Sequence, residues 1–121
     1  MSLNVVDSSA WLEYLADTAR AKNFSAAIED TDNLIVPAIV LYEVCKKVRR
    51  ERGEDAALQV AAMLESGRII EVDASLALEA SRLDLPLADS LIYATARRIG
   101  ATIWTQDADF KGLDDIRYFA K

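Results

Sequence analysis

A chain of 121 residues with 52% hydrophobic residues is long and apolar enough to fold around its own core, which excludes an intrinsically disordered protein. The net charge of −6 is a poor match for a protein that binds nucleic acid through overall charge, but it permits a local basic patch or metal-mediated binding. The lack of histidine excludes histidine-based triads and metal sites, and the single cysteine excludes an internal disulfide. With no signal peptide and no long apolar run, we expect a cytoplasmic protein without a membrane segment.

The chain opens on a short apolar run over residues 3–6 that ends at Asp7. A helical pattern begins at Ala10, so we expect a strand that turns directly into a helix. An alanine-rich second helix is expected over residues 19–28. The further elements expected in chain order are a strand at 34–36, a helix from Pro37 to about Arg52, a helix at 56–65, a strand at 69–72, helices at 73–82 and 88–99, a strand at 102–105 and an edge strand at 116–119.

Short strands that alternate with helices are typical of an α/β fold, in which a parallel sheet carries helices on both faces. The sequence contains no internal repeat, low-complexity segment or linker. We therefore expect a single domain over residues 1–121.

Four acidic residues fall where the expected strands end or the following helices begin. Asp7 follows the first strand and Asp107 follows the fourth. Glu43 lies about two turns into the helix after the second strand, and Asp89 lies in the first turn of the helix that leads to the fourth. Because these positions share the carboxyl edge of a parallel sheet, we expect the four acids to meet there, with Asp109 as a weaker fifth candidate.

Each acid also has a purely structural interpretation. Asp7 and Asp107 could cap helices, and the helix dipole favours Asp89 near a helix start. Glu43 could form a surface pair with Lys47, four residues later. Glu43 is the most informative of the four, because it flanks the apolar face of its helix, where an unpaired carboxylate is costly.

Clustered carboxylates repel one another and raise each other's pKa, and a divalent cation removes that repulsion. Oxygen ligands suit Mg²⁺ or Mn²⁺. Such an ion also lowers the pKa of a bound water and orients a phosphate, which makes phosphodiester hydrolysis feasible without histidine.

A basic cluster at the end of the Glu43 helix is a candidate phosphate track toward the acids. The alternative is a solvated helix end that the dipole favours. The candidate substrate-binding residues are Lys46, Lys47, Arg49 and Arg50.

Three stretches of the sequence resemble the PIN domain family, and most closely its VapC-type toxins from toxin–antitoxin pairs. They are V-V-D-S-S-A-W-L near the start, P-A-I-V-L-Y-E-V in the middle, and L-P-L-A-D-S-L-I-Y-A-T-A-R-R-I-G-A-T-I-W-T-Q-D-A-D-F toward the end. The closing block is the most specific of the three, and together the stretches span nearly the whole chain.

This resemblance implies a Mg²⁺- or Mn²⁺-dependent ribonuclease, built as an α/β/α sandwich with a central parallel sheet of about five strands. It also implies homodimers and inhibition by a cognate antitoxin. The site residues that it implies are the catalytic acids Asp7, Glu43, Asp89 and Asp107, the metal ligands Asp7, Asp89, Asp107 and Asp109, and the accessory hydroxyl residues Ser8 and Thr105.

Two other functions share some of these features. A phosphoacceptor receiver domain is also small, acidic and α/β, but it needs adjacent acids after the first strand and a lysine near the end of the fifth. Asp7 stands alone, and Lys111 and Lys121 are poorly placed for that role. A PIN-like domain that only binds is the second alternative, and the intact acids argue against it.

Overall fold

All five strands of the sheet run parallel, in the order β3-β2-β1-β4-β5. The computed structural model describes residues 2–121. It places β1 (Leu3–Val6) at the centre, between β2 (Leu34–Pro37) and β4 (Ala101–Thr105). The edges are β3 (Arg68–Ile70) and β5 (Ile116–Tyr118), which confirms the expected C-terminal edge strand.

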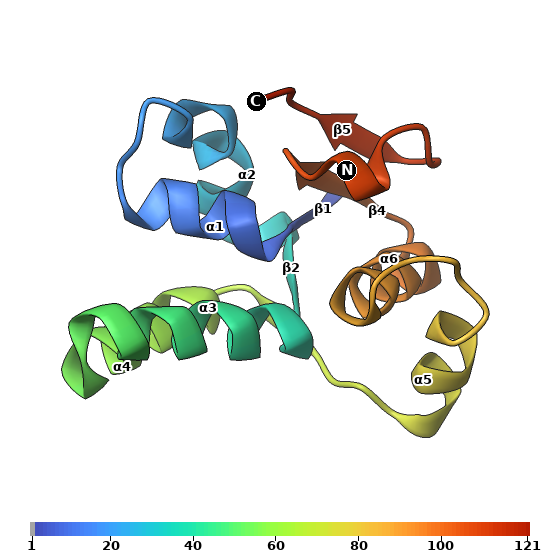
Figure 1. Cartoon of the computed structure of the whole chain (residues 1–121), viewed down its shortest axis with the longest axis horizontal. Coiled ribbons are helices and arrows are strands. Elements are labelled where there is room, and N and C mark those ends of the chain that lie inside the picture. The colour runs from blue at the N-terminus through green and yellow to red at the C-terminus, as the bar shows by residue number, and fades with distance from the viewer. Residues whose placement is uncertain (1) are drawn as a thin grey trace.

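Helices flank the sheet on both sides, as expected for the α/β/α arrangement. Figure 1 shows α1 to α4 on one side of the strands and α5 and α6 on the other. The helices are α1 (Ser8–Leu15), α2 (Ser25–Glu29), α3 (Ala38–Arg52), α4 (Glu54–Leu64), α5 (Ala74–Ala80) and α6 (Leu87–Ile99), with short 3₁₀ turns η1 (Ala21–Asn23), η2 (Thr31–Asn33) and η3 (Ala108–Phe110).

The prediction of one continuous helix over residues 19–28 is wrong, because the chain forms η1 and then α2. Asn23 and Ser25 flank the break, and such side chains compete with the helix for backbone hydrogen bonds. Ser25 Oγ donates to a backbone carbonyl in the preceding turn. Between them Phe24 is fully buried and packs edge-to-face on Phe119, with ring centroids 5.3 Å apart. Tertiary packing of one aromatic residue thus overrides the alanine-rich pattern.

Two elements are shorter than the sequence suggests. The third strand ends at Ile70, and Val72 lies beyond it with 43% of its surface exposed. Asp73 precedes α5 as its cap and accepts a hydrogen bond from the Leu76 N–H at 2.8 Å. The helix ends at Ala80 instead of continuing to about residue 82.

The strand order reverses between β1 and β4. The chain moves outward from β1 through β2 to β3, then crosses back through α5 and α6 to pair β4 on the other side of β1. In open parallel sheets such a switch point leaves a crevice at the carboxyl ends, where ligands bind. The order also differs from the 2-1-3-4-5 order of receiver domains, which argues against that alternative.

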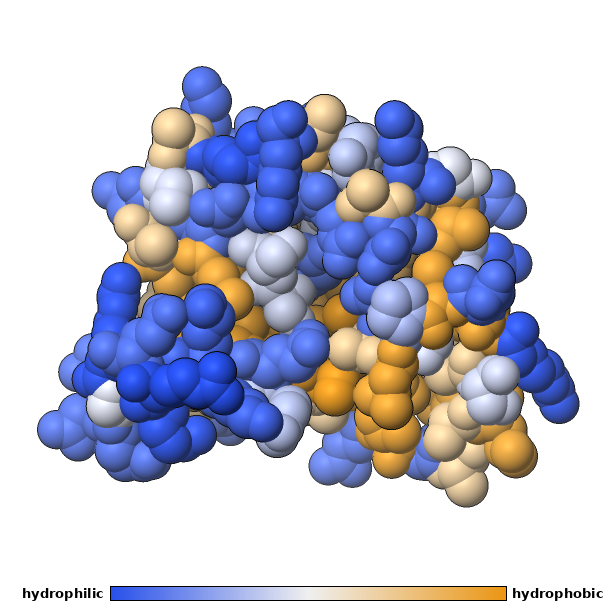
Figure 2. Space-filling view, in the orientation of Figure 1, coloured by the Kyte–Doolittle hydropathy of each residue, from blue (hydrophilic) through white to orange (hydrophobic). Residues whose placement is uncertain are grey.

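The space-filling view shows apolar surface on the side of α5 and α6 (Figure 2). Leu78 in α5 and Leu87 at the start of α6 are 63% and 74% exposed. In the part of the chain that the structure describes, no helix combines the length and the hydropathy needed to cross a membrane.

Candidate active site

A cavity of about 310 Å³ opens at the carboxyl ends of β1 and β4. The four acids predicted from topology all line it, so the structure brings together residues from four distant stretches of the chain. The lining residues are Asp7, Ser8, Ser9, Leu12, Glu43, Lys47, Asp89, Ile92 and Asp107.

Asp7 lies at the floor of the site, with 3% of its surface exposed. It caps α1, because its carboxylate accepts hydrogen bonds from the Ala10 N–H at 3.0 Å and from Ser9 Oγ at 3.3 Å. Burial raises the pKa of Asp7, and the charge of Asp107 raises it further, while the hydrogen bonds from Thr105 and Ala10 oppose the shift. The capping role and the site role of Asp7 therefore coexist.

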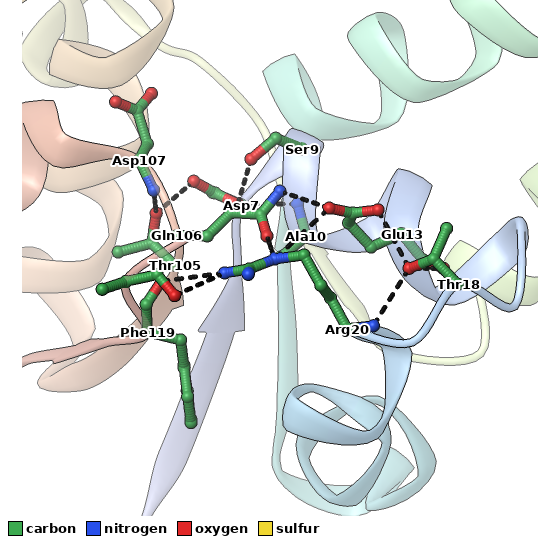
Figure 3. Close-up of polar contacts among 11 residues, drawn as sticks. Asp7, Ser9, Ala10, Glu13, Thr18, Arg20, Thr105, Gln106, Asp107 and Phe119 are labelled. Carbon is green, nitrogen blue, oxygen red and sulfur yellow. Dashed lines mark hydrogen bonds and ion pairs between the residues drawn. The ribbon is translucent and has the colours of Figure 1, made fainter.

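Thr105 connects the ends of the two central strands (Figure 3). Its side chain is fully buried, and Oγ1 donates to Asp7. The same oxygen accepts a hydrogen bond from the Asp107 N–H at 2.9 Å. One hydroxyl thus fixes the first acid of the chain relative to the segment that carries Asp107.

Three carboxylates form a cluster, and two of them, Asp89 and Asp107, line the cavity. Asp89, Asp107 and Asp109 each offer an oxygen, and these oxygens lie within 4.8 Å of one another. Burial, followed by the neighbouring Asp107 and Asp109, raises the pKa of Asp89 to about 7. The shift therefore comes first from burial and only second from the repulsion that the sequence suggested. Carboxylate oxygens are hard donors, and these three repel one another when ionised. Such a set fits a divalent cation such as Mg²⁺ or Mn²⁺.

Glu43 is half-buried on α3, and Ser8 at the start of α1 holds it. Ser8 Oγ donates to Glu43 Oε1 at 2.6 Å. Lys47 does not form the surface ion pair with Glu43 that the sequence suggested. Its Nζ instead lies 3.0 Å from Glu51 Oε2, and its side chain lines the cavity. Glu43 and Lys47 thus bring an acid and a cation from α3 to the same cavity.

The predicted phosphate-binding residues separate into two groups. Lys46, Lys47 and Arg50 line a second hollow of about 280 Å³ beside the acidic cavity. Arg49 instead forms a two-point ion pair with Glu54, with its Nε 2.6 Å from the carboxylate. Three of the four basic candidates therefore face one hollow next to the acids.

Sequence reasoning missed a polar network behind the site (Figure 3). Gln106 lies between Thr105 and Asp107 and is 4% exposed. Its amide donates to Glu13 Oε2 at 2.9 Å, and its carbonyl accepts from Arg20 Nε. Arg20 also donates to the backbone carbonyls of Phe119 and Ala120, at 3.2 and 3.0 Å. The position of Gln106 between two site residues was its one signal in the sequence.

Replacing Arg20 with methionine is expected to lower the free energy of unfolding by about 1–3 kcal/mol, because the buried Gln106 carbonyl loses its donor. Urea titration followed by circular dichroism measures the change. Lys22→Met is the matched control, since Lys22 is an exposed cation of the same segment. Equal stability of the two variants would contradict a supporting role for Arg20.

Three solved structures show the same fold at low sequence identity. A toxin–antitoxin complex from Klebsiella pneumoniae matches with a TM-score of 0.81 and 17% identity, over 98% of this chain and 99% of that chain. The sarcin–ricin loop cleaving toxin VapC20 of Mycobacterium tuberculosis matches with a TM-score of 0.74 and 25% identity, over 93% of this chain and 95% of that chain. VapBC2 of Rickettsia felis, bound to a promoter DNA fragment, matches with a TM-score of 0.71 and 16% identity, over 98% of each chain.

Comparison with curated proteins finds no match. The PIN domain family model matches residues 5–116, from the middle of β1 to the first residue of β5. The match thus spans every segment that contributes an acid to the cavity. With the family model covering nearly the whole sequence and VapC toxins among its structural neighbours, this chain belongs to the PIN domain family.

Proposed function

We propose that this chain is a Mg²⁺- or Mn²⁺-dependent endoribonuclease, the toxin of a toxin–antitoxin pair, acting as a single domain over residues 1–121 in the cytoplasm. The observation that carries the proposal is the convergence of Asp7, Glu43, Asp89 and Asp107 on one cavity. Membership of the PIN family supports a nuclease, and the neighbour described as a sarcin–ricin loop cleaving toxin supports RNA as the substrate.

Asp89, Asp107 and Asp109 are the residues proposed to hold the cation, with Asp7 completing the acidic floor. When bound, a divalent cation supplies positive charge against a phosphate and makes a water molecule more acidic. Thr105 keeps the two acidic segments in register through its shared hydroxyl. These side chains are therefore placed before substrate arrives, which lowers the cost of reaching the reacting geometry.

Glu43 and Lys47 are proposed to act on the substrate from α3. Ser8 Oγ donates a hydrogen bond to Glu43 Oε1 and orients this carboxylate. Glu43 is proposed to accept a proton from the attacking water. Lys47 lines the same cavity and is assigned to a phosphate oxygen. Both roles rest on the position of these groups at the acidic cavity.

We propose a cognate antitoxin and a second copy of the chain as protein partners. Toxin–antitoxin complexes among the structural neighbours support the antitoxin. The exposed side chains of Leu78 and Leu87 offer apolar surface to a partner, and Leu87 lies two residues before Asp89. A partner that covered this end of α6 would reach the mouth of the acidic cavity.

The proposal is tested with protein purified free of any antitoxin and a structured RNA. Cleavage is expected with Mg²⁺ or Mn²⁺, and it is expected to disappear with EDTA and in Asp7→Asn and Asp89→Asn. Equally strong cleavage in the variants or in EDTA would reject the metal-nuclease function. RNA binding without any cleavage by the wild type would instead indicate a catalytically silent PIN-like binding module.

A further inference from the structure

Tyr42 is an exposed aromatic side chain beside the acidic cavity. It directly precedes Glu43 on α3, and 57% of its surface is exposed. Burying an aromatic ring contributes more than burying most other side chains, so an exposed ring next to a candidate site calls for an explanation. The helix turns its apolar face inward at Val40 and Val44, which leaves Tyr42 on the opposite, outer side.

The ring lines the second hollow, which shares two wall residues with the acidic cavity. Tyr42, Glu43, Lys46, Lys47 and Arg50 form its wall, and Glu43 and Lys47 also line the cavity that holds the acids. A ligand that reached the acids through this hollow would pass the ring and its basic neighbours.

Lys46 lies at the edge of the ring and leaves its faces uncovered by the ammonium group. Its Nζ is 3.0 Å from the Tyr42 hydroxyl and 5.3 Å from the ring centroid. These two distances together place the ammonium beyond the hydroxyl end of the ring. A flat group stacked on the ring would therefore have a positive charge at its rim.

A flat aromatic group joined to a negative charge describes a nucleotide. Proteins bind single-stranded nucleic acid by stacking bases on aromatic side chains inside a positively charged groove. In a duplex the base faces are already stacked, so only an unpaired base fits this arrangement.

We propose that Tyr42 is a stacking platform for one unpaired nucleobase of the RNA substrate, with Lys46 and Arg50 binding the adjoining phosphates. The assignment rests on the proposed ribonuclease function and specifies its substrate as an RNA with a single-stranded segment at the site. A protein segment anchored on the same ring is the competing occupant. The cations Lys46, Lys47 and Arg50 in the wall, against the single carboxylate of Glu43, favour the polyanion.

The test measures binding in the Asp89→Asn background, so that cleavage does not consume the probe. A fluorescein-labelled RNA hairpin with a single-stranded loop is titrated with protein, and anisotropy gives the Kd. Tyr42→Ala is expected to weaken binding about 5- to 150-fold, the range for loss of one base–aromatic stack. Tyr42→Phe is expected to retain binding. Leu58→Ala, which truncates an apolar side chain with 58% exposure on α4, is the matched control and should change nothing.

Abasic substitution along the loop identifies the stacked base. At one position, loss of the base should weaken binding to the Tyr42 protein but not to Tyr42→Ala. Unchanged RNA binding by Tyr42→Ala would overturn the proposal. So would abasic substitutions that weaken binding equally in the Tyr42 protein and in Tyr42→Ala at every loop position. Weakened antitoxin binding with unchanged RNA binding would overturn it in favour of a protein contact. If the wild type does not cleave RNA but the abasic pattern is seen, the proposed nuclease function fails while the platform stands.

Discussion

Asp89→Asn is expected to raise the thermal midpoint of the metal-free protein by several degrees above neutral pH, although it removes a candidate metal ligand. Burial and the neighbouring Asp107 and Asp109 raise the pKa of Asp89 to about 7, so the fold disfavours its charged form. An asparagine keeps the shape of the side chain without that charge. For a domain of this size, each kcal/mol of stability corresponds to roughly 4 °C in Tm.

The effect has a defined pH dependence. The folded protein holds the Asp89 proton up to a pH of about 7, whereas the unfolded chain releases it near its ordinary value of 3.8. Between these values the folded state binds more protons, so the wild type loses stability as the pH rises. The advantage of Asp89→Asn should therefore grow from a pH near 3.8 upward, so that it is smaller at a pH of about 5 than above the folded-state pKa of about 7, where it reaches its maximum.

Calorimetry in EDTA at the two ends of this range measures the difference. Asp84→Asn, at an exposed aspartate in the segment before α6, is the control and should show no such growth with pH. Addition of Mn²⁺ should then stabilise the wild type, by about 2.7 kcal/mol at a hundred times its Kd, and leave Asp89→Asn almost unchanged. If the thermal midpoints of the wild type and Asp89→Asn differ by the same amount at all pH values, the raised pKa of Asp89 is contradicted.

The acids of the site were predictable because topology alone brings them together. A parallel strand ends at the carboxyl edge, so Asp7 and Asp107 had to share that edge once β1 and β4 were recognised. The same rule placed Glu43 and Asp89, which lie early in helices that begin there. No distance was needed for this conclusion, only the order of strands and helices along the chain.

The supporting contacts were not predictable, because they depend on side-chain geometry, whether the two partners are distant in sequence or close. Arg20 and Gln106 are separated by 86 positions and meet behind the site. Arg49 belonged to the predicted basic track, yet its partner Glu54 lies past the turn at Gly53, whose backbone sets how α3 and α4 meet. Local sequence patterns predict the faces of helices and the ends of strands. Side-chain pairs such as these depend on how turns and packed elements orient the two partners.

Thr105→Val is expected to reduce cleavage about 10- to 100-fold, since small displacements of positioned catalytic groups cost that much. Valine has nearly the shape of threonine and is well tolerated in a strand, so packing in β4 is preserved. What disappears is the oxygen that donates to Asp7 and accepts from the Asp107 N–H. Asp7 then loses a hydrogen bond that opposes its raised pKa, so its pKa should rise further.

The same substitution is expected to lower the free energy of unfolding by about 1–3 kcal/mol, because it leaves buried polar groups without their partner. Thr105→Ser keeps the hydroxyl and should retain most of the stability and the cleavage. Single-turnover cleavage across pH separates positioning from simple destabilisation: the rising limb of the profile should move to higher pH in Thr105→Val, as the proton on Asp7 is held more tightly. A profile that falls uniformly without moving would mean that the hydroxyl stabilises the fold and does not tune Asp7, and full activity in Thr105→Val would remove Thr105 from the site altogether.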